Sequence, residues 1–309
     1  MFFGTPTFAK ICLDKMIKEG CNVVAVVTAP DKASGRGKKI NFPAIKKFAL
    51  NANLPILQPV NLKNPLFVEE LKSFQPDLFV VVAFRMLPEV VWSLPPLRTF
   101  NLHASLLPNY RGAAPINWVI INGEKNSGVS TFYIDDKIDC GGLLMQASIE
   151  LATDETVGTL HDKLAKIGSE LICQTVEGLT EGGLSEEQQQ LTGFEKTAPK
   201  LNNKNVSIDW NLSLKQIESH IRGLNPYPGA RTSLTDENKT EVMKVLRSTI
   251  EKTTHDFENH QLIVQDKKIL ISHPEGFLVC EEVQLPNKKR MLAVDLLNGY
   301  TFSSKISVK

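Results

Sequence analysis

Residues 100–115 read FNLHASLLPNYRGAAP, and the rest of the chain is arranged around this stretch. Asn101 and His103 are two residues apart, so on an extended segment both side chains project from the same face. Pro108 ends any strand, and residues 110–112 belong to a loop. An amide and an imidazole therefore emerge together where a strand gives way to a loop. Open α/β sheets usually hold their functional groups at such a point.

The surrounding chain alternates between strand and helix patterns at short spacing. An apolar run at 78–83 predicts a central buried strand, and the β-branched run at 21–28 predicts another. Further strands are expected at 1–4, 54–57, 128–134 and 143–151, and helices at 43–51, 64–74 and 114–122. This alternation predicts a doubly wound, mostly parallel sheet. No GxGxxG follows the first strand, so a dinucleotide-binding fold is disfavoured.

Helix starts carry local signals. In the Thr-Pro pair at 5–6 and the Asn-Pro pair at 64–65, the first residue fits an N-cap and proline fits the first helical position. Thr153 or Asp154 is expected to cap the longest helix, whose apolar side chains recur at helical spacing.

Composition sets the bounds on domain number and class. The 309 residues are enough for two domains, and a net charge of +1 with 42% hydrophobic residues is typical of a soluble globular protein. Any nucleic-acid site must therefore be a local patch. Five cysteines, at positions 12, 21, 140, 173 and 280, show no metal-ligand spacing and predict reduced thiols in a cytoplasmic protein. The absence of a secretory segment and of a long apolar run predicts neither export nor a membrane span.

A polar stretch at 181–205 lacks apolar periodicity and is interpreted as a linker. It separates a first domain at 1–180 from a second at 206–309. In the second domain we expect a helix at 214–223 and short strands, which suggest a small β-barrel of the OB-like kind. The strand candidates are 241–247, 260–264, 268–272 and 276–285.

Asp139 lies in the turn KIDCGG at 137–142, whose two glycines let the backbone approach a ligand closely. Together, Asn-x-His, Ser-Leu-Leu-Pro, Tyr-Arg-Gly-Ala-Ala-Pro and the later Asp-x-Gly-Gly resemble the 10-formyltetrahydrofolate-dependent formyltransferases. The resemblance covers nearly the whole chain and is greatest to the members that act on charged initiator tRNA. It implies a Rossmann-like catalytic domain. Only three residues precede Gly4, fewer than in that family.

The resemblance implies transfer of a formyl group from 10-formyltetrahydrofolate to the amino group of methionyl initiator tRNA, in support of translation initiation. Asn101 is expected to donate its amide to the formyl oxygen, where negative charge develops. His103 is expected to share that stabilisation in its protonated form or to assist proton transfer, and Asp139 to hold the imidazole and favour its charged form. No metal is expected.

The resemblance also places the folate co-substrate against two segments. One follows the central strand and comprises Phe84, Arg85, Met86 and Leu87. The other comprises Ser105, Leu106, Leu107 and Pro108.

A basic loop, APDKASGRGKKIN at 29–41, is a solvated surface loop if its composition is considered alone. In the tRNA-acting members a similar loop inserts against the acceptor stem, so the resemblance implies tRNA contacts here. Arg36 is expected to make planar bidentate contacts, and Lys38 and Lys39 to act as point charges. A second basic cluster, at 288–290, is either a solvated turn or a phosphate contact. We expect no membrane association and no obligate protein partner.

Two alternatives stay open. The first is a formyltransferase for a small acceptor, such as an amino-sugar nucleotide or glycinamide ribonucleotide. The basic loop argues against it, since a small acceptor has no use for that loop. The second is a tRNA-binding protein without activity, against which the intact Asn101, His103 and Asp139 argue.

Overall fold

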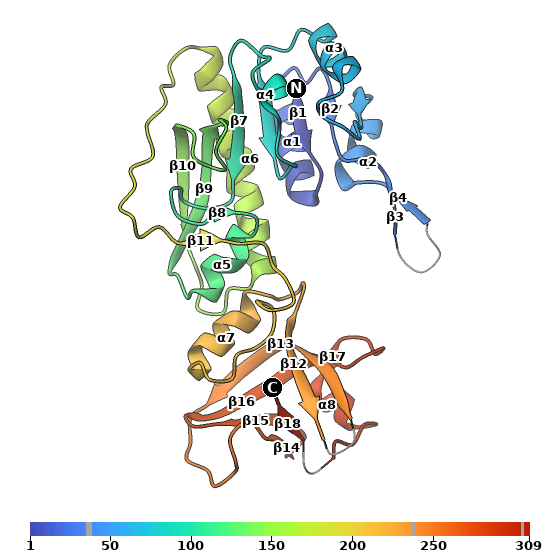
Figure 1. The fold of residues 1–309 in the computed structure, drawn as a ribbon, viewed down its shortest axis with the longest axis vertical. Helices are drawn as coiled ribbons and strands as arrows, with labels where there is room; N and C mark the ends of the chain where they lie inside the picture. The colour runs from blue at the N-terminus through green and yellow to red at the C-terminus, as the bar shows by residue number, and fades with distance from the viewer. Residues whose placement is uncertain (35–38, 237–238, 304–305) are drawn as a thin grey trace. The chain divides into compact units, whose positions relative to one another are not determined.

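The computed structural model describes residues 1–34, 39–236, 239–303 and 306–309. Packing groups them into two compact units, shown with their elements in Figure 1. The first unit contains residues 1–112, 126–150 and 161–197, and the second contains 113–125, 151–160 and 198–309. The division of the chain at 1–180, 181–205 and 206–309 stays a sequence-based prediction.

The first unit is built on a seven-stranded sheet of order β10-β9-β7-β6-β1-β2-β5. Its strands are β1 (Phe2–Gly4), β2 (Val26–Val27), β5 (Ile56–Leu57), β6 (Phe79–Val82), β7 (Thr99–His103), β9 (Asn126–Tyr133) and β10 (Leu143–Glu150). The strands β5, β2, β1, β6 and β7 are parallel to one another, and β9 runs antiparallel to both of its neighbours, β7 and β10. The predicted doubly wound, mostly parallel sheet is confirmed.

Helices flank this sheet, and aromatic side chains fill its core. The helices are α1 (Thr7–Lys18), α2 (Ala44–Asn51), α3 (Pro65–Ser73), α4 (Glu89–Trp92) and α6 (Val157–Thr180), the last of which begins in the second unit. Phe3 and Phe79 are fully buried, with ring centroids 4.8 Å apart. Burying such large apolar surfaces is the main favourable contribution to the fold.

The helix starts follow local sequence only in part. The Asn64 side chain accepts a hydrogen bond from the Leu66 amide at 3.0 Å, as predicted for an N-cap. The predicted cap at residue 5 is wrong, because α1 begins at Thr7 and Pro6 holds the cap position in an extended conformation. The predicted caps at residues 153 and 154 are also wrong: these residues form a turn, and the Thr156 hydroxyl accepts from the Thr159 amide at 3.2 Å.

The second unit contains an antiparallel sheet of order β14-β15-β16-β13-β12-β18, with β17 paired to β16. Its strands are β12 (Ala230–Thr235), β13 (Thr240–Glu251), β14 (Leu262–Gln265), β15 (Lys268–His273), β16 (Gly276–Gln284), β17 (Met291–Leu292) and β18 (Ser307–Val308). The amide of Leu262 donates to the Ile306 carbonyl at 2.9 Å, and that of Val308 to the His260 carbonyl at 2.8 Å. The two ends of the sheet therefore meet, and the predicted barrel-like fold is confirmed.

Three helices belong to the second unit: α5 (Pro115–Ile121), α7 (Leu214–Arg222) and α8 (Ala293–Leu297). The remaining short strands are β3 (Lys32–Ser34), β4 (Lys39–Asn41), β8 (Arg111–Gly112) and β11 (Thr197–Ala198). The expected loop at 110–112 is wrong in part, because Arg111 and Gly112 form β8, which pairs with β11. The sequence also did not predict β3, β4, β11, β12, β17, β18, α4 or α8.

Candidate active site

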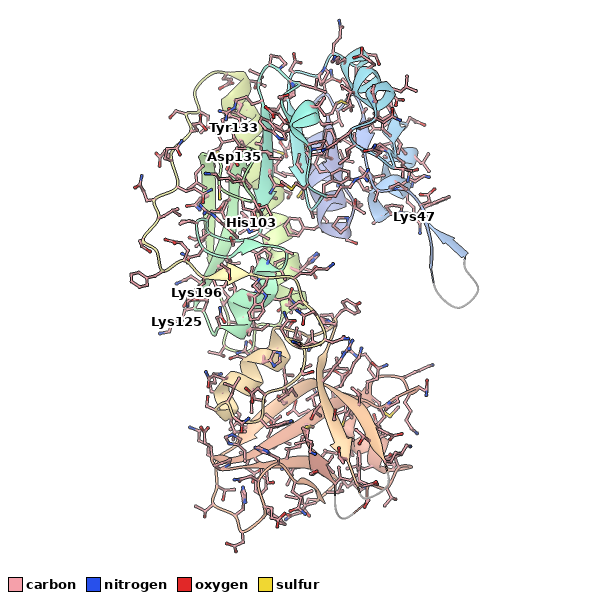
Figure 2. The ribbon with its side chains drawn as sticks, viewed as in Figure 1. Lys47, His103, Lys125, Tyr133, Asp135 and Lys196 are labelled. Atoms are coloured by element: carbon pink, nitrogen blue, oxygen red, sulfur yellow. The ribbon has the colours of Figure 1, made fainter. Side chains whose placement is uncertain are left out.

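Asn101 and His103 lie on β7, in the middle of the first sheet, and Figure 2 shows His103 among these strands. Asn101 is in register with Val81 on β6 and Phe132 on β9. Its side chain is half-buried and, among the described residues, makes no hydrogen bond. The amide of Asn101 is therefore available to a ligand.

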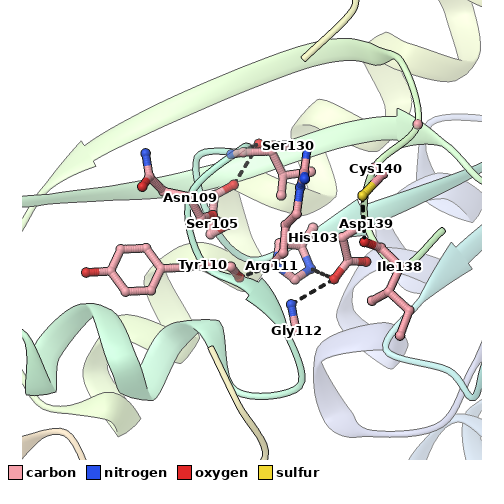
Figure 3. Close-up of polar contacts among 12 residues, drawn as sticks. His103, Ser105, Asn109, Tyr110, Arg111, Gly112, Ser130, Ile138, Asp139 and Cys140 are labelled. Atoms are coloured by element: carbon pink, nitrogen blue, oxygen red, sulfur yellow. Dashed lines mark hydrogen bonds and ion pairs between the residues drawn. The ribbon is translucent and has the colours of Figure 1, made fainter. Parts of the chain in front are cut away.

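His103 is 6% exposed, and both of its ring nitrogens face oxygen atoms (Figure 3). Nε2 donates to the carbonyl oxygen of Tyr110 at 2.8 Å, and this acceptor fixes a proton on Nε2. Nδ1 lies 3.8 Å from Oδ2 of Asp139, within ion-pair range but beyond a direct hydrogen bond. The structure therefore brings the predicted His103 and Asp139 together from segments far apart in the chain.

Asp139 is held by the loop that follows β7. Its Oδ2 accepts from the Gly112 amide at 2.9 Å, and its backbone has φ +55°, in the left-handed region. Two other non-glycine residues of the surrounding loops, Ala83 and Tyr110, have φ +46° and +62°. Such conformations cost on the order of 1–3 kcal/mol each and often gather at functional sites.

The turn that carries Asp139 needs glycine at position 141. A Cβ added to Gly141 would lie 1.8 Å from the carbonyl oxygen of Tyr133. The sequence led us to expect that this glycine brings backbone close to a ligand. In the structure it brings backbone close to backbone, where the end of β9 approaches the turn.

A groove of about 830 Å³ opens beside the carboxyl end of β6. It is lined by Val60, Asn61, Leu62, Lys63, Arg85, Met86, Leu87, Pro88, Glu89 and Val90. Met86 is 66% exposed, whereas the Arg85 guanidinium donates to the Val60 carbonyl at 2.9 Å and to that of Pro59. Three of the four residues predicted to contact folate here therefore line a groove of the size that small ligands occupy; Phe84 is not among its lining residues.

The second segment predicted to contact folate forms a tightly bonded loop. The Ser105 hydroxyl donates to the Asn109 carbonyl at 2.7 Å, and the Ser130 hydroxyl donates to the Ser105 carbonyl at 2.6 Å. Gln146 donates to the carbonyl of Leu107 at 2.9 Å, and the Leu107 side chain is buried. Folate contacts by Ser105, Leu106, Leu107 and Pro108 stay predictions.

The basic loop is described only at its base. Strand β3 pairs with β4 in antiparallel register, and Lys39 begins β4. Arg36 and Lys38 lie outside the described residues. The assignment of tRNA contacts to this loop stays a prediction.

Sequence reasoning missed Gln189, which contacts the candidate site from the segment interpreted as a linker. Its amide nitrogen donates to the carbonyl oxygens of Asp139 and Gly141. The polar surroundings of Gln189 in the sequence give no periodic or motif signal that marks this one residue.

The described residues contain no cluster of three or more His, Cys, Asp or Glu side chains that could hold a metal ion. Within the same part of the chain, no helix combines the length and apolar character needed to cross a bilayer. Whether the reaction uses a metal is a separate matter, and the metal-free mechanism stays a prediction.

Two family models match the chain: formyl transferase at residues 1–176 and formyl transferase, C-terminal domain, at residues 200–301. The methionyl-tRNA formyltransferase of Flavobacterium johnsoniae is 48% identical over 100% of this chain and 98% of the relative. The methionyl-tRNA formyltransferase of Bacteroides thetaiotaomicron is 44% identical over 98% of this chain and 96% of the relative. Among solved structures, a sugar 3N-formyl transferase in the presence of dTDP and 5-N-formyl-THF matches with a TM-score of 0.65 and 19% sequence identity. The match covers 93% of this chain and 97% of that chain. At this identity it is evidence for the fold only. The chain belongs to the formyl transferase family.

Proposed function

We propose that this protein transfers the formyl group of 10-formyltetrahydrofolate to the amino group of methionyl initiator tRNA, in support of translation initiation. The observation that carries the chemistry is the amide of Asn101, which has no partner among the described residues and lies on the same strand as His103 of the His103–Asp139 pair. The acceptor is supported by full-length relatives named methionyl-tRNA formyltransferase.

The reaction forms a bond between the amine nitrogen and the formyl carbon and breaks the bond from that carbon to folate. Asn101 donates its amide to the formyl oxygen as negative charge develops there. Because Nε2 of His103 is already bonded to the Tyr110 carbonyl, Nδ1 is the ring nitrogen that takes the amine proton, which passes to the departing folate nitrogen when its bond to the formyl carbon breaks. Asp139, 3.8 Å from Nδ1, offsets the positive charge that the imidazole then carries.

The folate co-substrate is assigned to the groove beside β6. The backbone of the segment Phe84 to Leu87 contacts the pterin, and the segment Ser105 to Pro108 also contacts tetrahydrofolate. The solved sugar 3N-formyl transferase of the same fold, studied with 5-N-formyl-THF, supports a folate co-substrate.

The acceptor tRNA is assigned to the basic loop. Arg36 makes bidentate contacts to the acceptor stem, and Lys38 and Lys39 add phosphate contacts. Such contacts release counterions, so affinity for tRNA falls steeply with salt. We place the protein in the cytoplasm, without an obligate protein partner.

The test measures formyl transfer from 10-formyltetrahydrofolate to methionyl initiator tRNA, charged elongator tRNA and an amino-sugar nucleotide. Wild type is compared with Arg36→Ala and with Lys72→Ala, which removes a positive charge from an exposed position of α3. Selective formylation of the initiator, with a higher KM for tRNA in Arg36→Ala only, supports the proposal.

The other outcomes overturn defined parts of it. Transfer to the sugar nucleotide alone would keep the catalytic residues and discard the tRNA acceptor. No transfer to any acceptor would overturn the function. Equal KM values for the two variants would overturn the role of the loop.

A further inference from the structure

The segment at 186–196, interpreted from sequence as part of a linker, packs against the candidate active site. Glu187 exchanges two backbone hydrogen bonds with Leu143, at 2.7 and 2.8 Å. Glu186 forms an ion pair with Arg98 at 2.9 Å. The carbonyl of Lys196 accepts from the Tyr110 amide at 2.5 Å. The segment is therefore attached on both sides of Gln189.

Gln189 uses all of its hydrogen-bonding capacity at this site. Its Oε1 accepts from Nε and Nη2 of Arg111 at 3.2 and 2.5 Å. Its Nε2 donates to the carbonyl oxygens of Asp139 at 3.0 Å and Gly141 at 2.8 Å. A glutamine amide offers two donors and two acceptor sites, and here each has a partner. The neighbouring Gln188 and Gln190 are exposed, whereas Gln189 is half-buried.

These bonds close a ring around the carboxylate of Asp139. Gln189 holds the backbone of Asp139, and the Gly112 amide holds its side chain. Arg111, which binds the other end of Gln189, directly precedes Gly112 in the chain. The backbone of Asp139 adopts a left-handed conformation that persists only where surrounding contacts enforce it.

We propose that Gln189 is a positioning residue, which sets the carboxylate of Asp139 relative to His103 by joining the turn at 139–141 to strand β8 at 111–112. The role in catalysis rests on the proposed function. Glutamate at this position would retain the contact to Arg111 but place a carboxylate oxygen against two carbonyl oxygens. Asparagine is one methylene shorter and cannot span the same gap.

The first experiment compares Gln189→Ala and Gln189→Glu with the matched controls Gln188→Ala and Gln190→Ala. We expect both changes at position 189 to lower kcat by up to about 100-fold, because a displacement of about 1 Å at a catalytic group can cost that much. KM for tRNA stays near that of wild type, and both controls stay within about twofold of wild type. A wild-type rate in Gln189→Ala overturns the positioning role, and a wild-type rate in Gln189→Glu overturns the part played by the two carbonyl bonds.

A double-mutant cycle separates positioning from general stabilisation of the fold. Because Gln189 acts through Asp139, Gln189→Ala should add no further loss of kcat in an Asp139→Asn background. Additive losses would mean that Gln189 acts independently of Asp139 and would overturn the proposal.

A measurement without substrate tests the structural role of Gln189 separately from the proposed formyl transfer. Amide hydrogen exchange at Gly112 reports its bond to the Asp139 carboxylate. Faster exchange in Gln189→Ala than in Gln188→Ala would support the conclusion that Gln189 connects the Asp139 turn to residues 111–112. This result would hold even if the wild-type protein transferred no formyl group. Equal exchange in the two variants would overturn this conclusion.

Discussion

Asn101 and Asn109 carry the same side chain, eight residues apart, and differ in what surrounds them. The Asn109 side-chain oxygen accepts from the Lys196 amide at 3.1 Å and so fixes the loop. The Asn101 amide has no partner among the described residues. The half-buried Asn101 amide holds no protein partner that a ligand oxygen would first have to displace. The surroundings, and not the residue type, distinguish the candidate catalytic amide from the structural one.

Replacing Asn101 with alanine should therefore lower activity without lowering stability. We expect kcat for formyl transfer to fall by about 10²–10³, the cost of losing one donor to a developing oxyanion. The melting temperature should stay near that of wild type, because no hydrogen bond within the described protein is lost. Asn22→Ala, at an exposed position, is the control for both measurements. A near-normal kcat in Asn101→Ala would contradict the assignment.

Gly141→Ala should disturb the turn that carries Asp139. The added Cβ would meet the Tyr133 carbonyl at 1.8 Å, so the backbone has to move, at a cost on the order of 1–3 kcal/mol in the free energy of unfolding. Formyl transfer should fall with it, because the Asp139 carboxylate moves away from His103. Gly183→Ala is the matched control, since a Cβ there meets nothing within 4 Å. Equal stability of the two variants, measured by chemical denaturation, would show that the turn tolerates the methyl group.

For single residues, the sequence predicted the site residues that are identified by their spacing and missed the one that is identified by contacts with distant segments. The two-residue interval between Asn101 and His103 was sufficient to place both side chains on one face of a strand. Asp139 was found through its glycine-rich turn and the family resemblance. Gln189 could not be found, because its partners are about 50 and 78 residues away and its neighbours are also glutamines.

Helices and strands with strong local signals are where the sequence predicted them. The buried run at 78–83 became β6, and Asn64 caps α3 through a bond within its own first turn. The start of α6 was wrong because residues 153 and 154 turn before the helix begins. The buried Glu155 carboxylate accepts from the Ala152 amide at 3.3 Å and helps to fix this turn. An N-cap is a local feature, but which of several candidate residues caps the helix depends on which neighbouring side chains are buried.

The corrected cap can be tested with a pair of threonines. Thr156→Ala removes the hydroxyl that accepts from the Thr159 amide and should cost about 1 kcal/mol in the free energy of unfolding. Thr153→Ala, at an exposed position before the helix, should change it by less than about 0.5 kcal/mol. Denaturant titration of both variants decides between them. A larger loss in Thr153→Ala would restore the cap predicted from sequence.

On the scale of the whole molecule, each of the two compact units is held together by strands that pair although they are distant in the sequence. The sequence predicted a sheet and a barrel, because alternation and strand length are visible locally. It missed β12 and β18, whose paired residues, Leu234 with Val308 and Thr235 with Ser307, are 74 and 72 positions apart in the sequence. Within the stretch interpreted as a linker, 181–205, the structure places residues 186–196 in the first unit. Polar composition does not reveal packing that is made through backbone and amide hydrogen bonds.

The second unit should lose stability as the pH falls below neutrality. His220 on α7 is buried, and loss of solvation lowers its pKa from the usual value, while Nε2 donates to the Asn205 carbonyl at 3.0 Å. On acidification through the unfolded-state pKa of about 6.5, the unfolded chain takes up this proton before the folded one does, so the free energy of unfolding decreases. The contribution of neutral His220 to the free energy of unfolding is complete above the unfolded-state pKa and is lost as the pH falls through the lower folded-state pKa.

His220→Gln should therefore show a smaller loss of stability between pH 7 and pH 5.5 than wild type, measured by chemical denaturation. Asn22→Ala, at an exposed position that carries no titratable group, serves as the control and should keep the wild-type slope. An unchanged slope in His220→Gln would mean that other groups cause the acid sensitivity.

The meeting of β14 and β18 also bears on how copies of this protein behave in a crowded solution. A sheet with an open side offers unpaired amides and carbonyls to any other extended chain, which is a common route to aggregation. In the second unit, the Gln261–Ser307 bridge and its neighbouring bonds use those groups within one molecule. Weakening this closure should therefore show first as concentration-dependent association, before any loss of formyl transfer.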